Sequence, residues 1–300
     1  LPLGLSMRDA MVADLMHVHD CSVSAATCVP VNTLPARAAP LRPLAGESAF
    51  AFVARQSALH DLVWLVAPET DGLLARFQRT VGDARWLGCS AEAITLAAGK
   101  QGTLAHLAAH GVPTPLAFEH APDIARWVVK PDDGAGGVAT QVHTSRAAAL
   151  ADQAGRAQAG AAVTLEPWIE GEALSLSLLC SGQNAEMLSV NRQRIAIDAH
   201  GRLCFEGVTV DALGRDDPRT RPLAELARQV ARAIPGLQGF AGIDLVWHPQ
   251  RGPVVIEVNP RVTCAYVGLS AALGRNLAAE LLASRLHGHH PDRELARGHA

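Results

Sequence analysis

Three oxygen-bearing side chains in one apolar stretch have the spacing of a metal site: Asp244, Glu257 and Asn259. Aliphatic residues surround them, and a loop with proline and glycine separates two short apolar runs. This pattern predicts a β-hairpin with strands over residues 243–247 and 254–259. Centring its turn between residues 250 and 251 gives three opposed pairs: Val246 with Val255, Asp244 with Glu257, and Asn259 with Gly242.

Opposed side chains on neighbouring strands share one face of the sheet, as do side chains two residues apart. Asp244 and Glu257 would therefore place two like charges about 5 Å apart, which destabilises a sheet unless a cation lies between them. Carboxylate and amide oxygens suit a hard divalent ion. We predict that these two residues and Asn259 bind Mg²⁺ or Mn²⁺; the alternative is an acidic pair that faces solvent.

Lysine is rare in this chain, and one of its two lysines leads into a loop that could bind phosphate. Among the 26 lysines and arginines, only Lys100 and Lys130 are lysines. Lys130 ends an apolar strand that leads into a loop with three glycines: Gly134, Gly136 and Gly137. Backbone N–H groups of such a loop can surround phosphate oxygens, and glycine allows the close approach. We predict phosphate binding here; the alternatives are an ordinary turn and the chance survival of two lysines.

The segment 166–172 follows the next predicted strand and combines an apolar, aromatic wall with hydrogen-bond acceptors. An apolar slot with backbone partners suits adenine, and a carboxylate suits ribose hydroxyls. A nucleotide site is therefore one interpretation of this segment, and surface glutamates at a turn are the other.

The composition excludes several classes of function. The net charge is −3 and no Lys/Arg-rich run occurs, so a nucleic-acid partner is not expected. Neither a membrane span nor a secretory signal pattern is present, so no membrane partner is expected. Six cysteines without a CxxC pair indicate free thiols in a reducing, cytoplasmic compartment. Five histidines lack ligand partners and are expected at the surface: His17, His19, His287, His289 and His290.

Alternating helices and strands must position these residues. The patterns predict helices over residues 7–15, 71–80, 90–100, 101–110, 146–158, 221–233 and 275–286, with Ser90 as an N-cap. They predict strands, besides the hairpin, over residues 62–67, 85–88, 127–130, 163–166, 174–179 and 187–191. Residues 30–48 and 198–219 favour irregular structure. The alternation up to residue 90 predicts a three-layer α/β domain, whose opening strand we expect before Leu1.

Taken in chain order, the two lysines, the glycine loop KPDDGAGG, the acidic segment and the string EVNPR resemble the ATP-grasp superfamily over about residues 60–285. The resemblance implies an α/β and α+β fold. A Rossmann-like pre-ATP-grasp domain would cover residues 1–90, and an ATP-grasp domain would cover residues 91–300. The latter would contain a small lid subdomain over about 115–170 and a C-terminal subdomain over about 171–290.

The resemblance also implies a role for each motif residue. Pro167 departs from the usual pattern of the segment that holds adenine. The implied roles are phosphate binding by Lys100, Lys130, Gly134, Gly136 and Gly137, adenine binding by Glu166, Trp168 and Ile169, ribose binding by Glu172, Mg²⁺ binding by Asp244, Glu257 and Asn259, and contact of Arg261 with the transferred phosphoryl group.

Enzymes of this superfamily typically pass the γ-phosphoryl group of ATP to a carboxylate, and an amine or thiol then attacks the acyl phosphate. The implied partners are thus a small-molecule acid and amine, and a homodimer is left open. Arg192 and Arg194 come from a strand near the same site. We predict that Arg192 acts in catalysis or Arg194 in substrate binding, by holding the acceptor carboxylate or the tetrahedral intermediate; the alternative is a surface strand end.

Three sequence segments indicate one group within this superfamily: NRQRI, NPRVTCAYVGL and VWLVAPETDGLL. They are similar to those of the tyramine–glutamate ligase group of methanofuran and methylofuran biosynthesis. The implied reaction joins the γ-carboxyl group of glutamate to tyramine with ATP. The alternatives are an ATP-grasp ligase for another amino acid, peptide or pterin-pathway intermediate, and a non-catalytic ATP-binding module.

Overall fold

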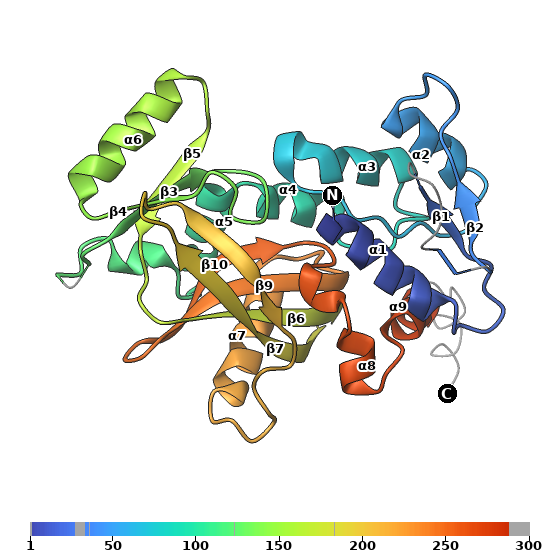
Figure 1. The fold of residues 1–300 in the computed structure, drawn as a ribbon. Helices are drawn as coiled ribbons and strands as arrows, with labels where there is room; N and C mark the ends of the chain where they lie inside the picture. The colour runs from blue at the N-terminus through green and yellow to red at the C-terminus, as the bar shows by residue number, and fades with distance from the viewer. Residues whose placement is uncertain (1, 28–33, 36, 123, 183, 288–300) are drawn as a thin grey trace, which may run out of the picture.

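Figure 1 shows the computed structural model, which describes residues 2–27, 34–35, 37–122, 124–182 and 184–287. The described strands form sheets of two, three and five strands. The two-stranded and three-stranded sheets lie at opposite ends of the molecule, and the five-stranded sheet lies between them (Figure 1).

The N-terminal part is built around the two-stranded parallel sheet β1–β2. The predicted helices over 7–15 and 71–80 are confirmed, although the first begins earlier. The predicted strands over 62–67 and 85–88 are reduced to one parallel bridge between Val63 and Trp86. The elements of this part are α1 (Pro2–Leu15), β1 (Ser24–Ala26), β2 (Ala39–Leu41), α2 (Ala49–Ser57), η1 (Thr70–Gly72) and α3 (Leu73–Val81).

The helices α4 (Ala91–Ala98) and α5 (Lys100–Ala109) join this part to the sheets that follow. Ser90 caps α4 as predicted, because its hydroxyl oxygen accepts a hydrogen bond from the Ala93 N–H at 3.2 Å. The helical conformation is interrupted at Gly99, which is extended. Lys100 therefore begins α5 and lies at its N-terminus. The short helix η2 (Pro115–Phe118) leads from α5 to the three-stranded sheet.

The three-stranded antiparallel sheet has the order β4–β3–β5 and is covered by α6 (Arg146–Gln158). Its strands are β3 (Trp127–Pro131), β4 (Gln141–His143) and β5 (Val163–Pro167). Trp127 and Val129 pack against Ala149 of α6. Because side chains alternate along a strand, Lys130 lies on the other face of the sheet.

The five-stranded antiparallel sheet has the order β10–β9–β6–β7–β8 and separates an apolar face from a polar one. The apolar face packs against α7 (Thr220–Ala233) in the main core, with buried leucines of β6 at 174, 176 and 178. The serines between them lie on the polar face, where Asn191 donates to Ser177 Oγ at 3.0 Å. The strands are β6 (Glu172–Ser181), β7 (Asn184–Ile197), β8 (Leu203–Thr209), β9 (Gly239–His248) and β10 (Gly252–Asn259).

The hairpin β9–β10 confirms the predicted pairs Asp244–Glu257 and Gly242–Asn259, but the predicted pair Val246–Val255 is wrong. Val246 pairs with Val254, and a β-bulge between Val255 and Glu257 shifts the register by one residue. A bulge adds one residue to one strand, so the turn is one residue tighter than the predicted one.

The strand β8 lies inside the segment 198–219, for which irregular structure was predicted. It pairs with β7, which continues six residues beyond the predicted end at Asn191. β8 is an edge strand, and the bulge opposite Arg194 interrupts its alternation of side chains. The last described elements are η3 (Cys264–Tyr266), α8 (Leu269–Leu273) and α9 (Leu277–His287). Helix α9 corresponds to the last predicted helix.

A substitution at Gly171 tests the junction between β5 and β6. Gly171 has φ +152°, and a Cβ atom there would collide with the Trp247 carbonyl oxygen. We expect Gly171→Ala to lower the free energy of unfolding by about 2–4 kcal/mol in urea denaturation. The control is Gly155→Ala in helix α6, where a Cβ meets no atom within 4 Å. The control should stabilise the protein by about 0.4–1 kcal/mol, and equal effects of the two variants would contradict this account.

Candidate active site

A cavity of about 1790 Å³ lies between the three-stranded and five-stranded sheets and extends past the segment 62–70 to residues of α1, β1 and α2. Its walls carry most of the residues singled out by the sequence. Charged and polar lining residues include Lys100, Lys130, Glu166, Gln193, Asp244, Glu257, Asn259 and Arg261. Strand alternation explains why the members on β3, β5, β7, β9 and β10 converge, because each of these strands turns every second side chain toward the cavity. Lys100 comes instead from the start of α5, and Arg261 from the segment after β10.

The two hairpin carboxylates face each other as predicted. Asp244 accepts hydrogen bonds from Gln193 Nε2 at 2.9 Å and from Asn259 Nδ2 at 3.2 Å. Burial and the neighbouring Glu257 carboxylate raise the pKa of Asp244 to about 7. The two facing carboxylates form a pair of hard oxygen ligands whose repulsion a divalent cation would relieve, and the Asn259 amide, whose oxygen accepts from Arg261 Nη2 at 3.3 Å, lies beside them. These residues therefore fit a Mg²⁺ ion, although no group of three His, Cys, Asp or Glu side chains suited to a metal occurs in the described part of the chain.

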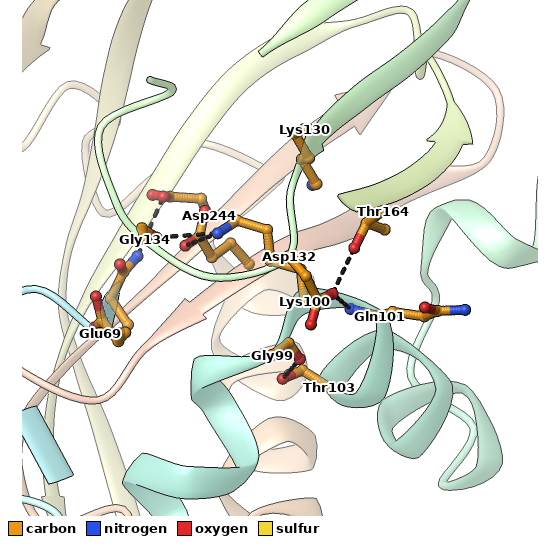
Figure 2. Close-up of polar contacts among 12 residues, drawn as sticks. Glu69, Gly99, Lys100, Gln101, Thr103, Lys130, Asp132, Gly134, Thr164 and Asp244 are labelled. Carbon is orange, nitrogen blue, oxygen red and sulfur yellow. Dashed lines mark hydrogen bonds and ion pairs between the residues drawn. The ribbon is translucent and has the colours of Figure 1, made fainter. Parts of the chain in front are cut away.

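Lys100 connects the glycine loop with the carboxylate pair. Its Nζ atom donates to the Gly134 carbonyl oxygen at 3.0 Å and lies 3.3 Å from Glu257 Oε1. Figure 2 shows the lysine reaching from the start of α5 toward Gly134. The lysine side chain is only 8% exposed. One ammonium group thus lies at both the expected phosphate loop and the expected metal site.

Asp132 of the glycine loop fixes the start of the helix that carries Lys100. Its Oδ1 atom accepts hydrogen bonds from the Gln101 N–H at 2.8 Å and from Thr164 Oγ1 at 2.5 Å (Figure 2). An aspartate at a helix N-terminus satisfies an otherwise unpaired N–H group and interacts favourably with the helix dipole. The glycine loop, β5 and α5 are therefore held together beside the cavity.

Lys130 forms a buried ion pair with Glu166. Its Nζ atom lies 2.6 Å from Glu166 Oε1, and the two side chains are 6% and 4% exposed. The second oxygen, Glu166 Oε2, and the indole nitrogen Trp168 Nε1 are also buried, and neither has a hydrogen-bond partner among the residues that the structure describes. A buried carboxylate oxygen without a partner is costly, and a bound ligand with an N–H group would satisfy it. Ile169 is buried and packs with Phe118 and Val254.

The three loop glycines have backbone conformations that other residues rarely adopt. Their φ angles are +92° for Gly134, +75° for Gly136 and +69° for Gly137, and all three line the cavity. Glycine adopts such angles without the steric cost that a Cβ atom brings. The loop can therefore turn its backbone toward the cavity.

Arg261 lies in the cavity wall and is bound by a residue to which the sequence analysis gave no role. Its Nε and Nη2 atoms donate to the two carboxylate oxygens of Glu69 at 2.8 and 3.0 Å.

Gln193 was also missed in the sequence, although it lies between two arginines that were singled out. Parity along β7 could have found it, because Gln193 shares a face with Asn191 and hence with Asp244.

The structure does not bring Glu172, Arg192 and Arg194 to the cavity wall. Arg192 Nε donates to Glu172 Oε1 at 2.6 Å, and Arg219 also pairs with Glu172. Arg194 lies 3.4 Å from Thr209 Oγ1. The arginines alternate with Gln193 and point to the opposite face of β7, which corrects the expectation that they lie near the site.

The remaining sequence expectations concern residues away from the cavity. His17 and His19 are exposed, as expected, whereas His289 and His290 lie outside the described residues. The described cysteines Cys21, Cys89, Cys180, Cys204 and Cys264 form no disulfide, and Cys28 lies outside that set. Within the described residues, every helix is too short or too polar to cross a membrane.

Comparison with known proteins agrees with this geometry. The ATP-grasp domain family matches residues 97–265, and the pre ATP-grasp 3 domain family matches residues 19–94. No curated protein sequence matches.

Several solved structures are similar to the chain. An ATP-grasp superfamily protein from Archaeoglobus fulgidus is 26% identical, with a TM-score of 0.57 over 76% of this chain and 67% of that chain. The L-amino acid ligase from Bacillus licheniformis is 19% identical, with a TM-score of 0.66 over 94% of this chain and 72% of that chain. D-alanine–D-alanine ligase from Bacillus anthracis is 16% identical, with a TM-score of 0.64 over 95% and 92%. The two ligases share the fold, and the matching domain family covers more than half of this chain, which therefore belongs to the ATP-grasp family.

Proposed function

We propose that this ATP-grasp enzyme is an ADP-forming carboxylate–amine ligase that acts through an acyl phosphate. The observation that carries the proposal is the position of Lys100, whose ammonium group contacts both the Gly134 carbonyl of the glycine loop and the Glu257 carboxylate. The proposed phosphate site and the proposed cation site would thereby be adjacent, as transfer of a phosphoryl group requires.

The residues of the cavity suit each part of this reaction. Lys100 and Lys130 would hold phosphate oxygens, while the free oxygen of Glu166 would accept a hydrogen bond from the adenine amino group. Asp244, Glu257 and Asn259 would hold Mg²⁺, which supplies charge neutralisation for the transferred group when bound. Arg261 would stabilise the charge of the same group.

The chemistry needs no nucleophile from the protein. The acceptor carboxylate oxygen attacks the γ-phosphorus, the bond to the β-phosphate oxygen breaks, and ADP leaves. The amine nitrogen then attacks the acyl carbon, phosphate leaves, and the nitrogen loses a proton to give the amide. Positioning and electrostatic stabilisation carry both steps.

For the substrates, we propose glutamate and tyramine, joined through the γ-carboxyl group in a methylofuran-type cofactor pathway. The strings that resemble the tyramine–glutamate ligase group support this assignment, and each of the three lines the cavity in part, for example through Val66, Gln193 and Cys264. The alternative is a ligase for another amino acid, a peptide or a pterin-pathway intermediate. Two of the similar structures are named as ligases of amino acids, which supports this alternative. A non-catalytic ATP-binding module would not require the metal-binding set.

The cellular setting and domain organisation belong to the same proposal. Free thiols support a reducing, cytoplasmic compartment. We place the domain boundary near residue 90, just before α4, with the lid subdomain over about 115–170 and the C-terminal subdomain over about 171–290. The three-stranded and five-stranded sheets fall on either side of residue 170, which supports the latter division.

A panel of acids and amines decides between these functions. The purified protein is incubated with ATP, Mg²⁺ and each acid–amine pair, and ADP, phosphate and amide product are measured. We expect turnover with glutamate and tyramine. Turnover with other pairs alone would refute those substrates and keep the ligase, whereas ATP binding without turnover in any pair would favour the binding module.

Removing one metal-binding carboxylate should abolish turnover. We expect Glu257→Gln to lower kcat by about 100-fold or more, because one charge that holds Mg²⁺ is lost. Far-ultraviolet circular dichroism should be unchanged, and a higher Mg²⁺ concentration should restore part of the rate. Glu225→Gln on the exposed face of α7 is the control, and wild-type activity in Glu257→Gln would refute the metal site.

Replacing the buried lysine with arginine tests the need for a compact ammonium group. Lys130 is enclosed beside Glu166, so the larger planar guanidinium of Lys130→Arg would displace the glycine loop. We expect kcat/KM for ATP to fall about tenfold or more, or ~1.4 kcal/mol of transition-state stabilisation. Arg228→Lys on α7 controls for the exchange of cation type, and a silent Lys130→Arg would contradict this role.

A further inference from the structure

The pair formed by Glu69 and Arg261 connects two distant parts of the sequence. The residues are 192 positions apart, and the guanidinium binds both carboxylate oxygens. The side chains are 3% and 10% exposed, respectively. Figure 2 shows Glu69 beside the glycine loop, on the side where Gly134 lies.

The geometry of this pair fixes the orientation of the arginine. A bidentate pair with two parallel N–H···O bonds sets the plane of the guanidinium, whereas a single contact would leave it free to rotate. Two more bonds complete the arrangement, from Nη2 to Asn259 Oδ1 at 3.3 Å and from Nη1 to the Val262 carbonyl at 3.1 Å. Arg261 therefore holds one orientation beside the expected metal ligands.

Burial of this pair suggests a purpose other than stability. Removing two charges from water costs free energy that their attraction often only balances, so a buried ion pair is weak evidence for a stabilising role. The pair lies in the wall of the cavity rather than in the apolar cores, since both the neighbouring Thr70 and Arg261 line that cavity. Orientation of a functional group is the role that such a location favours.

The loop that carries Glu69 is anchored a second time at the glycine loop. The Asp71 N–H donates to Asp133 Oδ2 at 2.8 Å. Asp71 and Gly72 adopt left-handed conformations, with φ +53° and +64°, which turn the chain sharply after Glu69. The loop that carries Glu69 is thus anchored to the glycine loop, while Arg261 holds the carboxylate of Glu69.

We propose that Glu69 is the positioning residue of Arg261. It holds the guanidinium in the plane from which Arg261 meets the transferred phosphoryl group, and it acts only through that arginine. This inference rests on the proposed function, in which Arg261 makes that contact.

The first test compares two matched substitutions. Glu69→Gln removes the charge and one of the two parallel hydrogen bonds, so we expect kcat to fall roughly 10- to 100-fold with little change in KM for ATP. Glu47→Gln is the control, because Glu47 forms the same bidentate pair with Arg55, at 2.7 Å for both bonds, and neither residue lines the cavity. Equal kcat values for the two variants would overturn the proposal.

A double-mutant cycle separates positioning from a merely structural role. If Glu69 acts only through Arg261, Glu69→Gln should change kcat by less than about twofold in the Arg261→Gln background. Multiplicative losses would overturn the proposal. If Glu69→Gln unfolds at a lower temperature than the Glu47→Gln control, Glu69→Asp, which keeps the charge, replaces it in the cycle.

Nucleotide affinity keeps this test independent of the proposed ligase activity. If the wild-type protein turns over no acid–amine pair, the proposed ligase activity is refuted. Calorimetric affinities for ATP and ADP then test whether Glu69 positions Arg261. The ratio of ATP to ADP affinity should fall in Glu69→Gln and in Arg261→Gln, and no further in the double variant. An unchanged ratio in Glu69→Gln would overturn the proposal.

Discussion

Asp244 and Glu257 face each other across β9 and β10, and the charges around them are arranged in response. Three cations of the cavity are each matched to one carboxylate: Lys130 to Glu166, Lys100 to Glu257, and Arg261 to Glu69. Asp244 receives hydrogen bonds from two amides instead, and burial raises the pKa of this carboxyl group to about 7. The excess negative charge therefore gathers where the hairpin forces two carboxylates together, and a divalent cation there would balance it.

This charge balance explains why the surrounding elements must meet so closely. Lys100 can reach Glu257 only because α5 begins beside the glycine loop, and Asp132 fixes that beginning. The loop in turn receives the Asp71 N–H from the N-terminal part of the chain. Three segments far apart in sequence are thus joined around the two carboxylates by polar contacts, while the leucines on the opposite face of β6 provide the apolar core.

Local patterns in the sequence predicted most of this site. Lys130 at the end of β3, the glycine loop and the opposition of Asp244 and Glu257 depend on alternation and turn residues within short stretches. Helix α6 was predicted with its observed bounds because alanines fill it, and the structure adds that Ser145 caps it. The ATP-grasp family match agrees with the resemblance that these motifs suggested.

The features of the site and fold that were not predicted depend on contacts between residues far apart in the sequence, or on irregularities within a strand. Glu69 meets Arg261 across 192 positions, and nothing near either residue in the sequence indicates the other. Arg192 and Arg194 attracted attention by their charge, although parity along β7 directs Gln193 to the cavity instead. The edge strand β8 was missed because a bulge and a glycine interrupt its alternation.

The bulge in β10 makes the opposition of Asp244 and Glu257 insensitive to the length of the turn beside them. The observed hairpin combines a tight turn between His248 and Gly252 with one extra residue near Ile256. A hairpin with a turn one residue longer and no bulge opposes Asp244 to Glu257 equally well, and it differs only in the pairing of residues 252–256. Insertions and deletions of single residues at this turn can therefore accumulate during evolution while the carboxylates stay in place.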